Sequence, residues 1–144
     1  MRIEELSVGD WVMARQVKWD YADPDTTEPM QIVAIDGSDP KRQYVDLSFG
    51  DNTVVHSAFV EDLQPIPITP DILEKNGFVR NGKYKEWNNT KNWDETPFIG
   101  ISLDRQSLRV KNFGRDIFIE DKVICVHELQ RSLRLAWADK KIEL

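Results

Sequence analysis

The chain has 144 residues, of which 40% are hydrophobic and 31% charged, with 19 Lys/Arg against 25 Asp/Glu. This length and apolar content suit one compact unit or two very small ones, and they exclude a wholly disordered chain. There is no apolar run of about 18 residues, which excludes a membrane-spanning helix, and the single Cys125 excludes an intramolecular disulfide. Because the N-terminal segment 1–6 also lacks the apolar core of a signal peptide, we expect a cytoplasmic protein with no membrane contact.

The first half of the chain is predicted to be β-structure. Its expected strands are 8–15, 30–35, 43–49 and 53–60. A Gly9–Asp10 turn precedes the first of them, and Val45, Leu47 and Phe49 alternate with polar residues in the third, which places them on one face. Since closure of a sheet removes exposed strand edges, we expect a small SH3-like β-barrel over residues 1–64.

A proline-rich connector follows. Residues 63–70 contain three prolines, which forbid a helix and favour a stiff, extended segment, so we place the boundary between two domains, 1–64 and 65–144, here. A short helix comes next: Thr69 can cap it, Pro70 suits its first position, and Gly77 can end it in a left-handed conformation.

The second half is predicted to be a small α+β domain, with an antiparallel sheet and two helices. Asn81–Gly82 is a strong hairpin signal, and 98–103 is expected to pair with 108–113. A further strand is expected within 116–125. The chain then changes to helical spacing, with one apolar stripe made of Val126, Leu129, Leu133, Ala136 and Trp137.

Charge differs between the two halves. Residues 1–64 carry 5 Lys/Arg against 13 Asp/Glu, whereas residues 65–144 carry 14 against 12. An acidic first half repels phosphate, so any contact with nucleic acid is expected in the second half. The plainer interpretation, which we favour, is that the acidic surface keeps the protein soluble.

Candidate catalytic and metal-binding residues are few. The chain has two histidines, His56 and His127, and no Cys/His spacing typical of a zinc site. Cys125 precedes a helix and lies near His127 in sequence, but the apolar residues around it favour a buried structural thiol. An acidic run lacks the alternating ligands and central glycine of a calcium loop; it comprises Asp20, Asp23, Asp25 and Glu28. We therefore expect a protein that is not an enzyme and has no cofactor.

One segment interleaves basic and aromatic residues. Its members are Arg80, Lys83, Tyr84, Lys85, Trp87, Lys91 and Trp93. Proteins that bind single-stranded nucleic acid use this combination, because cations contact phosphates and rings stack on bases. In the alternative, Tyr84 and Trp87 pack into the domain and the lysines are solvated. We favour the alternative, because Glu86, Asp94 and Glu95 dilute the positive charge.

The last helix offers a different surface. Leu135 falls opposite its apolar stripe, beside Arg131 and Arg134. An exposed leucine with apolar neighbours is typical of a dimer or partner interface. These three residues are therefore a candidate partner surface, and a homodimer is one interpretation of it.

Three motifs carry a resemblance to a known family. They are Leu6-Ser-Val-Gly-Asp-Trp-Val12, Pro67-Ile-Thr-Pro-Asp-Ile-Leu-Glu-Lys-Asn-Gly-Phe78 and Val126-His-Glu-Leu-Gln130. With them the chain resembles a family of uncharacterised small proteins from gut anaerobes and their phages and prophages. It departs from the family after Gln130, where Arg131–Trp137 stands in place of an Asn and several aromatic residues. The resemblance implies a mobile-element origin and a cytoplasmic location, and it implies no catalytic residues.

These observations lead to two main functional hypotheses. The first is a non-enzymatic, phage- or prophage-related accessory protein that acts through contacts with an unidentified protein partner. The alternative is an accessory factor that binds nucleic acid with the hairpin at residues 80–93. A third, more distant one is a hydrolytic enzyme, which would require carboxylates, or Cys125 with His127, to converge in a pocket.

Overall fold

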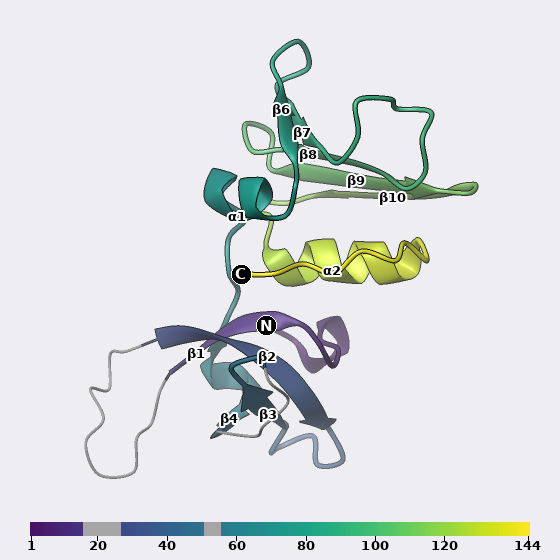
Figure 1. Cartoon of the computed structure of the whole chain (residues 1–144). Helices are drawn as coiled ribbons and strands as arrows, with labels where there is room; N and C mark the ends of the chain where they lie inside the picture. The colour runs from purple at the N-terminus through teal and green to yellow at the C-terminus, as the bar shows by residue number, and fades with distance from the viewer. Residues whose placement is uncertain (16–26, 51–55) are drawn as a thin grey trace. The chain divides into compact units, whose positions relative to one another are not determined.

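The computed structural model describes residues 1–15, 27–50 and 56–144 (Figure 1). The chain divides into two compact units, Met1–Ile66 and Pro67–Leu144. In the described part of the chain each unit has one five-stranded antiparallel sheet, and the two α-helices both belong to the second unit. The expectation of a mostly β, α+β protein is confirmed.

The sheet of the first unit is a meander whose last strand returns to its first. Its strands and 3₁₀ turns are η1 (Ile3–Glu5), β1 (Trp11–Arg15), β2 (Thr27–Asp36), β3 (Tyr44–Ser48), β4 (His56–Phe59), η2 (Val60–Asp62) and β5 (Leu63–Gln64). The strand order is β4-β3-β2-β1-β5. Within the described ranges β4 and β5 remain the two ends of this sheet, which therefore does not close, and the expected barrel is not confirmed.

The turn before β1 forms for a local reason. The Ser7 N–H donates to Asp10 Oδ2 at 2.8 Å, and the Asp10 N–H donates to the Ser7 carbonyl at 3.1 Å. Gly9 between them has φ +95°, which a side chain would strain. This is the predicted Gly-Asp turn.

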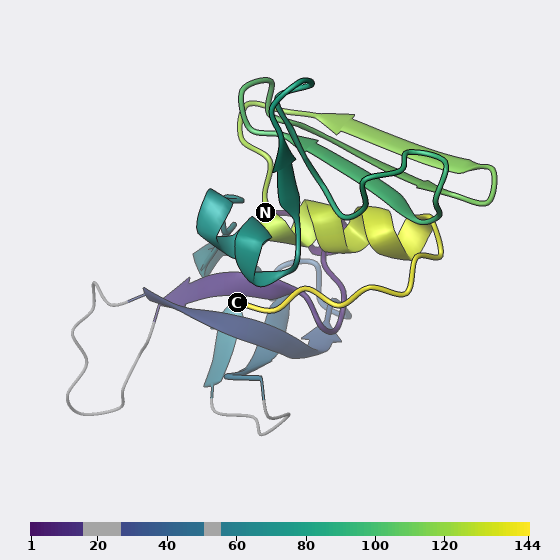
Figure 2. The same cartoon turned by 45° about the horizontal axis from the view of Figure 1, so that its top comes forward.

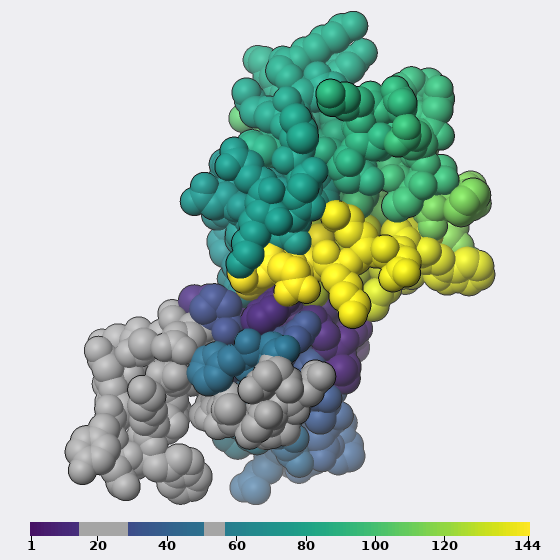
Figure 3. All heavy atoms as spheres, in the orientation of Figure 1, coloured from purple at the N-terminus to yellow at the C-terminus, as the bar shows by residue number. Residues whose placement is uncertain are grey.

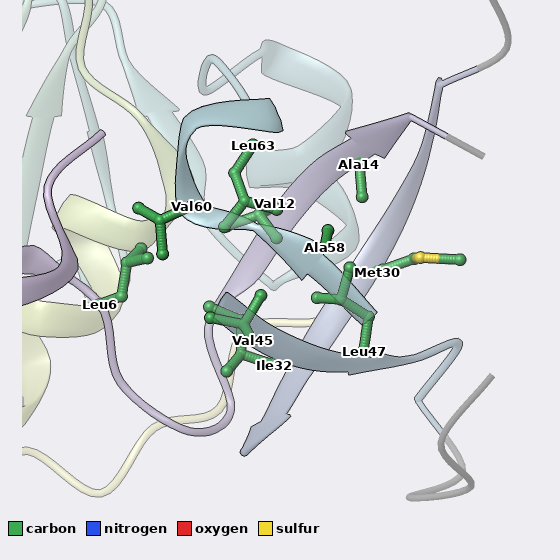
Figure 4. Close-up of a cluster of buried hydrophobic side chains, with 10 residues drawn as sticks. All are labelled: Leu6, Val12, Ala14, Met30, Ile32, Val45, Leu47, Ala58, Val60 and Leu63. Carbon is green, nitrogen blue, oxygen red and sulfur yellow. The ribbon is translucent and has the colours of Figure 1, made fainter. Parts of the chain in front are cut away.

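The core of the first unit consists of alternate residues on its strands (Figure 4). Its almost completely buried residues include Val12 of β1, Met30 and Ile32 of β2, and Val45 and Leu47 of β3. Phe49 was expected on the same face, but this prediction is wrong, because β3 ends at Ser48 and Phe49 is 47% exposed. Part of the predicted strand 53–60 forms β4, and residues 51–55 lie outside the described ranges.

In the second unit α2 covers one face of a five-stranded meander (Figure 2). The elements are α1 (Pro70–Lys75), β6 (Val79–Asn81), β7 (Glu86–Asn88), β8 (Phe98–Ser102), β9 (Ser107–Asn112), β10 (Arg115–Glu120) and α2 (Val126–Leu135), with strand order β10-β9-β8-β7-β6. The buried residues of the sheet and of α2 form the core: Trp87, Ile99, Ile101, Leu108, Val110, Val126, Leu129, Leu133 and Ala136.

Helix α1 begins and ends as predicted. The Ile72 N–H donates to Thr69 Oγ1 at 3.3 Å, and Pro70 occupies the first helical position. At the other end Gly77 has φ +80° and donates to the Glu74 carbonyl, while the Phe78 N–H donates to the Leu73 carbonyl at 3.0 Å. These two bonds make a Schellman motif, which is the ending that Gly77 predicted.

The connector before α1 is partly built into the second unit. Pro67 forms an isolated antiparallel bridge with Cys125, and the Ile68 N–H donates to the Ile124 carbonyl at 3.1 Å. These contacts hold the entry to α1 beside the entry to α2.

Candidate functional site

The basic and aromatic residues of the predicted nucleic-acid segment lie in different environments. Trp87 is only 8% exposed and pairs with Ile101 across the sheet, which places its ring in the core. Tyr84 and Trp93 are 63% and 68% exposed. The four cations are exposed as well: Arg80, Lys83, Lys85 and Lys91.

The two exposed rings of this segment do not share one platform. Tyr84 belongs to the β6–β7 turn, Gly82–Lys85, and Trp93 to the loop between β7 and β8, which project from different parts of the sheet (Figures 1 and 2). Lys83 Nζ lies 5.3 Å from the Tyr84 ring centroid, and Lys111 Nζ lies 5.5 Å from that of Trp93. The predicted hairpin exists, and Asn81 supports its turn by accepting a hydrogen bond from the Lys83 N–H at 3.1 Å.

An acidic side chain organises the loop that carries Trp93. Glu95 accepts hydrogen bonds from Thr90 Oγ1 at 2.5 Å and from Asn92 Nδ2 at 3.0 Å. Both bonds favour the charged carboxylate and lower the pKa of Glu95. A negative charge therefore sits two residues from Trp93, where a phosphate contact would need a positive one.

The candidate partner residues on α2 are all at the surface. Arg131 and Arg134 are exposed, and Leu135 is 47% exposed at the last position of the helix. Leu135 borders a larger group of exposed apolar side chains at this end of the helix.

Trp137 belongs to that group, which corrects its predicted place in the buried stripe. The helix ends at Leu135, and Trp137 follows with φ +56° and 75% exposure. The Trp137 N–H donates to the Arg134 carbonyl at 3.0 Å and the Ala138 N–H to the Leu133 carbonyl at 2.9 Å, a Schellman motif with tryptophan where glycine is usual. The change of backbone direction turns the indole out of the core.

The β9–β10 turn lies beside this helix end (Figures 1 and 2). Its two residues, Phe113 and Gly114, have φ +45° and +84°, and Phe113 is 85% exposed. The neighbouring Asn112 Nδ2 donates to the Ala136 carbonyl at 2.9 Å and to the Trp137 carbonyl at 3.1 Å. The turn and the helix end are thus tied together.

Arg115 completes the connection. Its Nη1 donates to the Leu135 carbonyl at 3.2 Å, and its guanidinium carbon lies 3.5 Å from the centroid of the Trp137 ring. Stacking of arginine on indole orients both side chains. We call the surface made by Phe113, Arg115, Leu135 and Trp137 the aromatic end; Figure 3 shows the chain's last segment, in yellow, at the molecular surface.

The backbone of the aromatic end is strained at Phe113 and Trp137, which both have a positive φ. For an L-residue with a Cβ the left-handed region costs roughly 1–2 kcal/mol, and Phe113 and Trp137 both occupy it. Glycine or asparagine would reduce the cost at either position. Neither ring is buried in return, and the stack of Trp137 on Arg115 offsets only part of this cost.

A polar groove of about 170 Å³ lies on the sheet face opposite α2. Its lining includes Glu86, Arg105, Arg109 and Glu120, charges of both signs that leave no strong net field, with Gly100 in its floor. A Cβ at Gly100 would lie 3.1 Å from Glu86 Oε2, so the missing side chain keeps the groove open. This arrangement favours no single class of ligand.

The candidate nucleophile is not activated. Cys125 is 5% exposed, and burial, followed by the charges of Glu128 and Asp121, raises its pKa to about 11. The thiol is therefore protonated at neutral pH, unlike a catalytic cysteine. The Glu128 carboxylate accepts from the Cys125 N–H at 2.8 Å, which gives this pair a structural role at the start of α2.

Other candidates give no site in the described part of the chain. No group of three or more His, Cys, Asp or Glu residues there could hold a metal ion. Asp20, Asp23 and Asp25 lie outside the described residues, and so do the side chains of Glu28 and His56, whose backbones belong to β2 and β4. Among the helices of the described ranges, none is long and apolar enough to cross a membrane.

Comparisons of the chain with protein-family models, with curated proteins and with solved structures gave no match.

Proposed function

We propose that this chain is a non-enzymatic accessory protein that binds a partner protein through the aromatic end. One observation carries the proposal: Phe113 and Trp137 are both strained and exposed, on two elements that Asn112 and Arg115 hold together. Strained, exposed residues cluster at binding sites, where the strain is offset by function and not by folding.

The residue types support a protein partner. Tryptophan and arginine dominate the energetics of protein interfaces, and a phenylalanine and a leucine beside them extend the apolar area. Burial of each large ring is worth roughly 3–4 kcal/mol before the costs of association. The stack of Trp137 on Arg115 reduces the side-chain entropy that the indole would lose when a partner binds.

We propose further that the first unit is an SH3-like barrel. Its support is the meander order in which β5 returns to β1 and the 3₁₀ turn η2 that directly precedes β5. Barrels of this kind commonly serve as binding modules, which is an analogy of fold and assigns no site. A phage or prophage origin rests on the three sequence motifs alone.

The test is a pull-down with the tagged full chain from a lysate of its host cell, with and without nuclease. Wild type and Tyr84→Ala, which removes an exposed ring elsewhere, are expected to capture the same nuclease-resistant protein. Trp137→Ala is expected to lose it, by about tenfold or more in recovery. Equal recovery by all three chains would refute the proposal.

The second candidate, nucleic-acid binding, has one specific observation in its favour. Tyr84 and Trp93 are exposed rings that each face a lysine. Binding would then weaken steeply with salt and be lost in Lys83→Glu and Trp93→Ala. Recovery of nuclease-sensitive material alone in the pull-down would favour this function over the first.

A further inference from the structure

Strand β10 is an open sheet edge of unusual length for this chain. It has six residues, and it pairs with β9 on one side only, with no second strand beside it in the described part of the chain (Figure 2). The other edge strands are shorter: β4 has four residues, β6 three and β5 two. Proteins usually shorten or cover such edges, since unpaired N–H and C=O groups recruit other strands.

The hairpin register identifies the backbone groups that are available. Asn112 and Arg115 flank a two-residue turn, so they form the first hydrogen-bonded pair, and Ile117–Val110 and Ile119–Leu108 are the next. The bond from the Asp121 N–H to the Gln106 carbonyl, at 3.1 Å, continues this alternation. The N–H and C=O groups of Asp116, Phe118 and Glu120 therefore point away from β9, toward the open side.

The side chains of the same three residues share one face of the sheet. Phe118 is 56% exposed between two exposed carboxylates, Asp116 and Glu120. Arg109 Nε donates to Asp116 Oδ1 at 3.1 Å from the neighbouring strand. The edge thus presents an acidic–aromatic–acidic pattern at alternate positions.

This pattern opposes pairing with a second copy. Antiparallel pairing of two β10 strands centred on Phe118 would use all the outward groups, but it would place Asp116 of each strand opposite Glu120 of the other. Like charges directly opposite each other destabilise a strand pair. The same pattern is complementary to an extended segment with basic, apolar and basic residues at alternate positions.

We propose that β10 binds such a segment of a partner protein by strand addition. Main-chain hydrogen bonds to Asp116, Phe118 and Glu120 would supply the affinity. A lysine or arginine opposite each carboxylate, with an aliphatic residue over Phe118, would supply the specificity. This site lies beyond the proposed function and does not depend on the aromatic end.

The test uses the full chain and two fluorescent, end-blocked peptides, Gly-Lys-Thr-Val-Thr-Lys-Gly and the same peptide with Glu in place of Lys. Fluorescence anisotropy measures affinity, and amide hydrogen exchange locates the bound peptide. The Lys peptide is expected to bind at least about tenfold more tightly than the Glu peptide. It is expected to slow exchange at the amides of Asp116, Phe118 and Glu120.

Two variants separate strand addition from nonspecific attraction. Phe118→Pro removes an outward N–H and no bond to β9, a position where an edge strand tolerates proline, and it is expected to abolish binding. Glu120→Lys keeps the backbone intact and is expected to narrow or reverse the preference between the two peptides. Trp137→Ala, at the aromatic end, is expected to bind the Lys peptide as wild type does.

The proposal is overturned if the Lys peptide does not bind at millimolar concentration, or if the preference persists in Glu120→Lys. It is also overturned if the β10 amides of the free chain become protected as its own concentration rises, because a second copy would then occupy the edge. Loss of the Lys peptide in Trp137→Ala would place that binding at the aromatic end instead.

Discussion

The backbone strain at Trp137 can be measured by comparing two substitutions. Both remove the indole, and they differ only in whether residue 137 has a Cβ that makes its positive φ unfavourable. Trp137→Ala and Trp137→Gly both remove the indole and its stack on Arg115, so both lose about 0.5–1 kcal/mol of stability from that contact. Alanine retains the left-handed cost of roughly 1–2 kcal/mol at φ +56°, and glycine does not. Glycine also lowers the free energy of unfolding by roughly 0.4–1 kcal/mol, because it gives the unfolded chain more conformational freedom. The glycine variant is therefore expected to be more stable than the alanine variant by about 1 kcal/mol.

The assay is urea unfolding of the full-length variants followed by the helical circular dichroism signal. In the described part of the chain both α-helices belong to the second unit, so this signal reports on the unit that contains the substitution. Both variants are expected to lose the partner in the pull-down although their stabilities differ. If the alanine variant proves as stable as the glycine variant, Trp137 is not strained, and the argument that its strain is offset by binding fails.

Three further predictions concern stability. Phe113→Asn places before Gly114 the residue that two-residue hairpin turns prefer. It is therefore expected to raise the free energy of unfolding by up to about 1 kcal/mol and to weaken capture of the partner. A lower free energy of unfolding would contradict this reasoning. Thr69→Ala is expected to lower the free energy of unfolding in urea by about 1 kcal/mol, and Thr69→Ser by much less. Serine retains a hydroxyl that can accept from the Ile72 N–H, whereas alanine does not. Equal losses would show that this cap contributes little to stability. Since burial raises the pKa of Cys125 to about 11, the protonated thiol stabilises the fold fully below the ordinary thiol pKa. This stabilisation is lost as the pH rises from the ordinary thiol pKa through about 11. Cys125→Ala should flatten that alkaline loss in pH-dependent unfolding, and an unchanged slope would assign it to other groups.

Local sequence predicted an element wherever one short segment carries its start and stop signals. Thr69, Pro70 and Gly77 predicted the ends of α1, and Ser7 and Asp10 bond to each other across the predicted turn. Hairpin signals and apolar alternation likewise predicted most strands of both sheets. The candidate partner residue Leu135 was found in this way, because helical spacing sets it apart from the buried stripe.

Only the tertiary structure shows which aromatic residues are buried and which are exposed, because the residues that contact them lie far away in sequence. Trp137 fits the helical stripe, yet the carbonyls at the end of α2 are capped by Asn112 and Arg115, which lie 24 and 20 residues from their acceptors. Phe113 becomes part of the same surface only when the β9–β10 turn lies beside that helix end. Trp87 could be a stacking platform or a core residue by sequence, and the sheet register places it in the core. The amino-acid pattern thus determined the elements, whereas their packing determined which aromatic residues face outward.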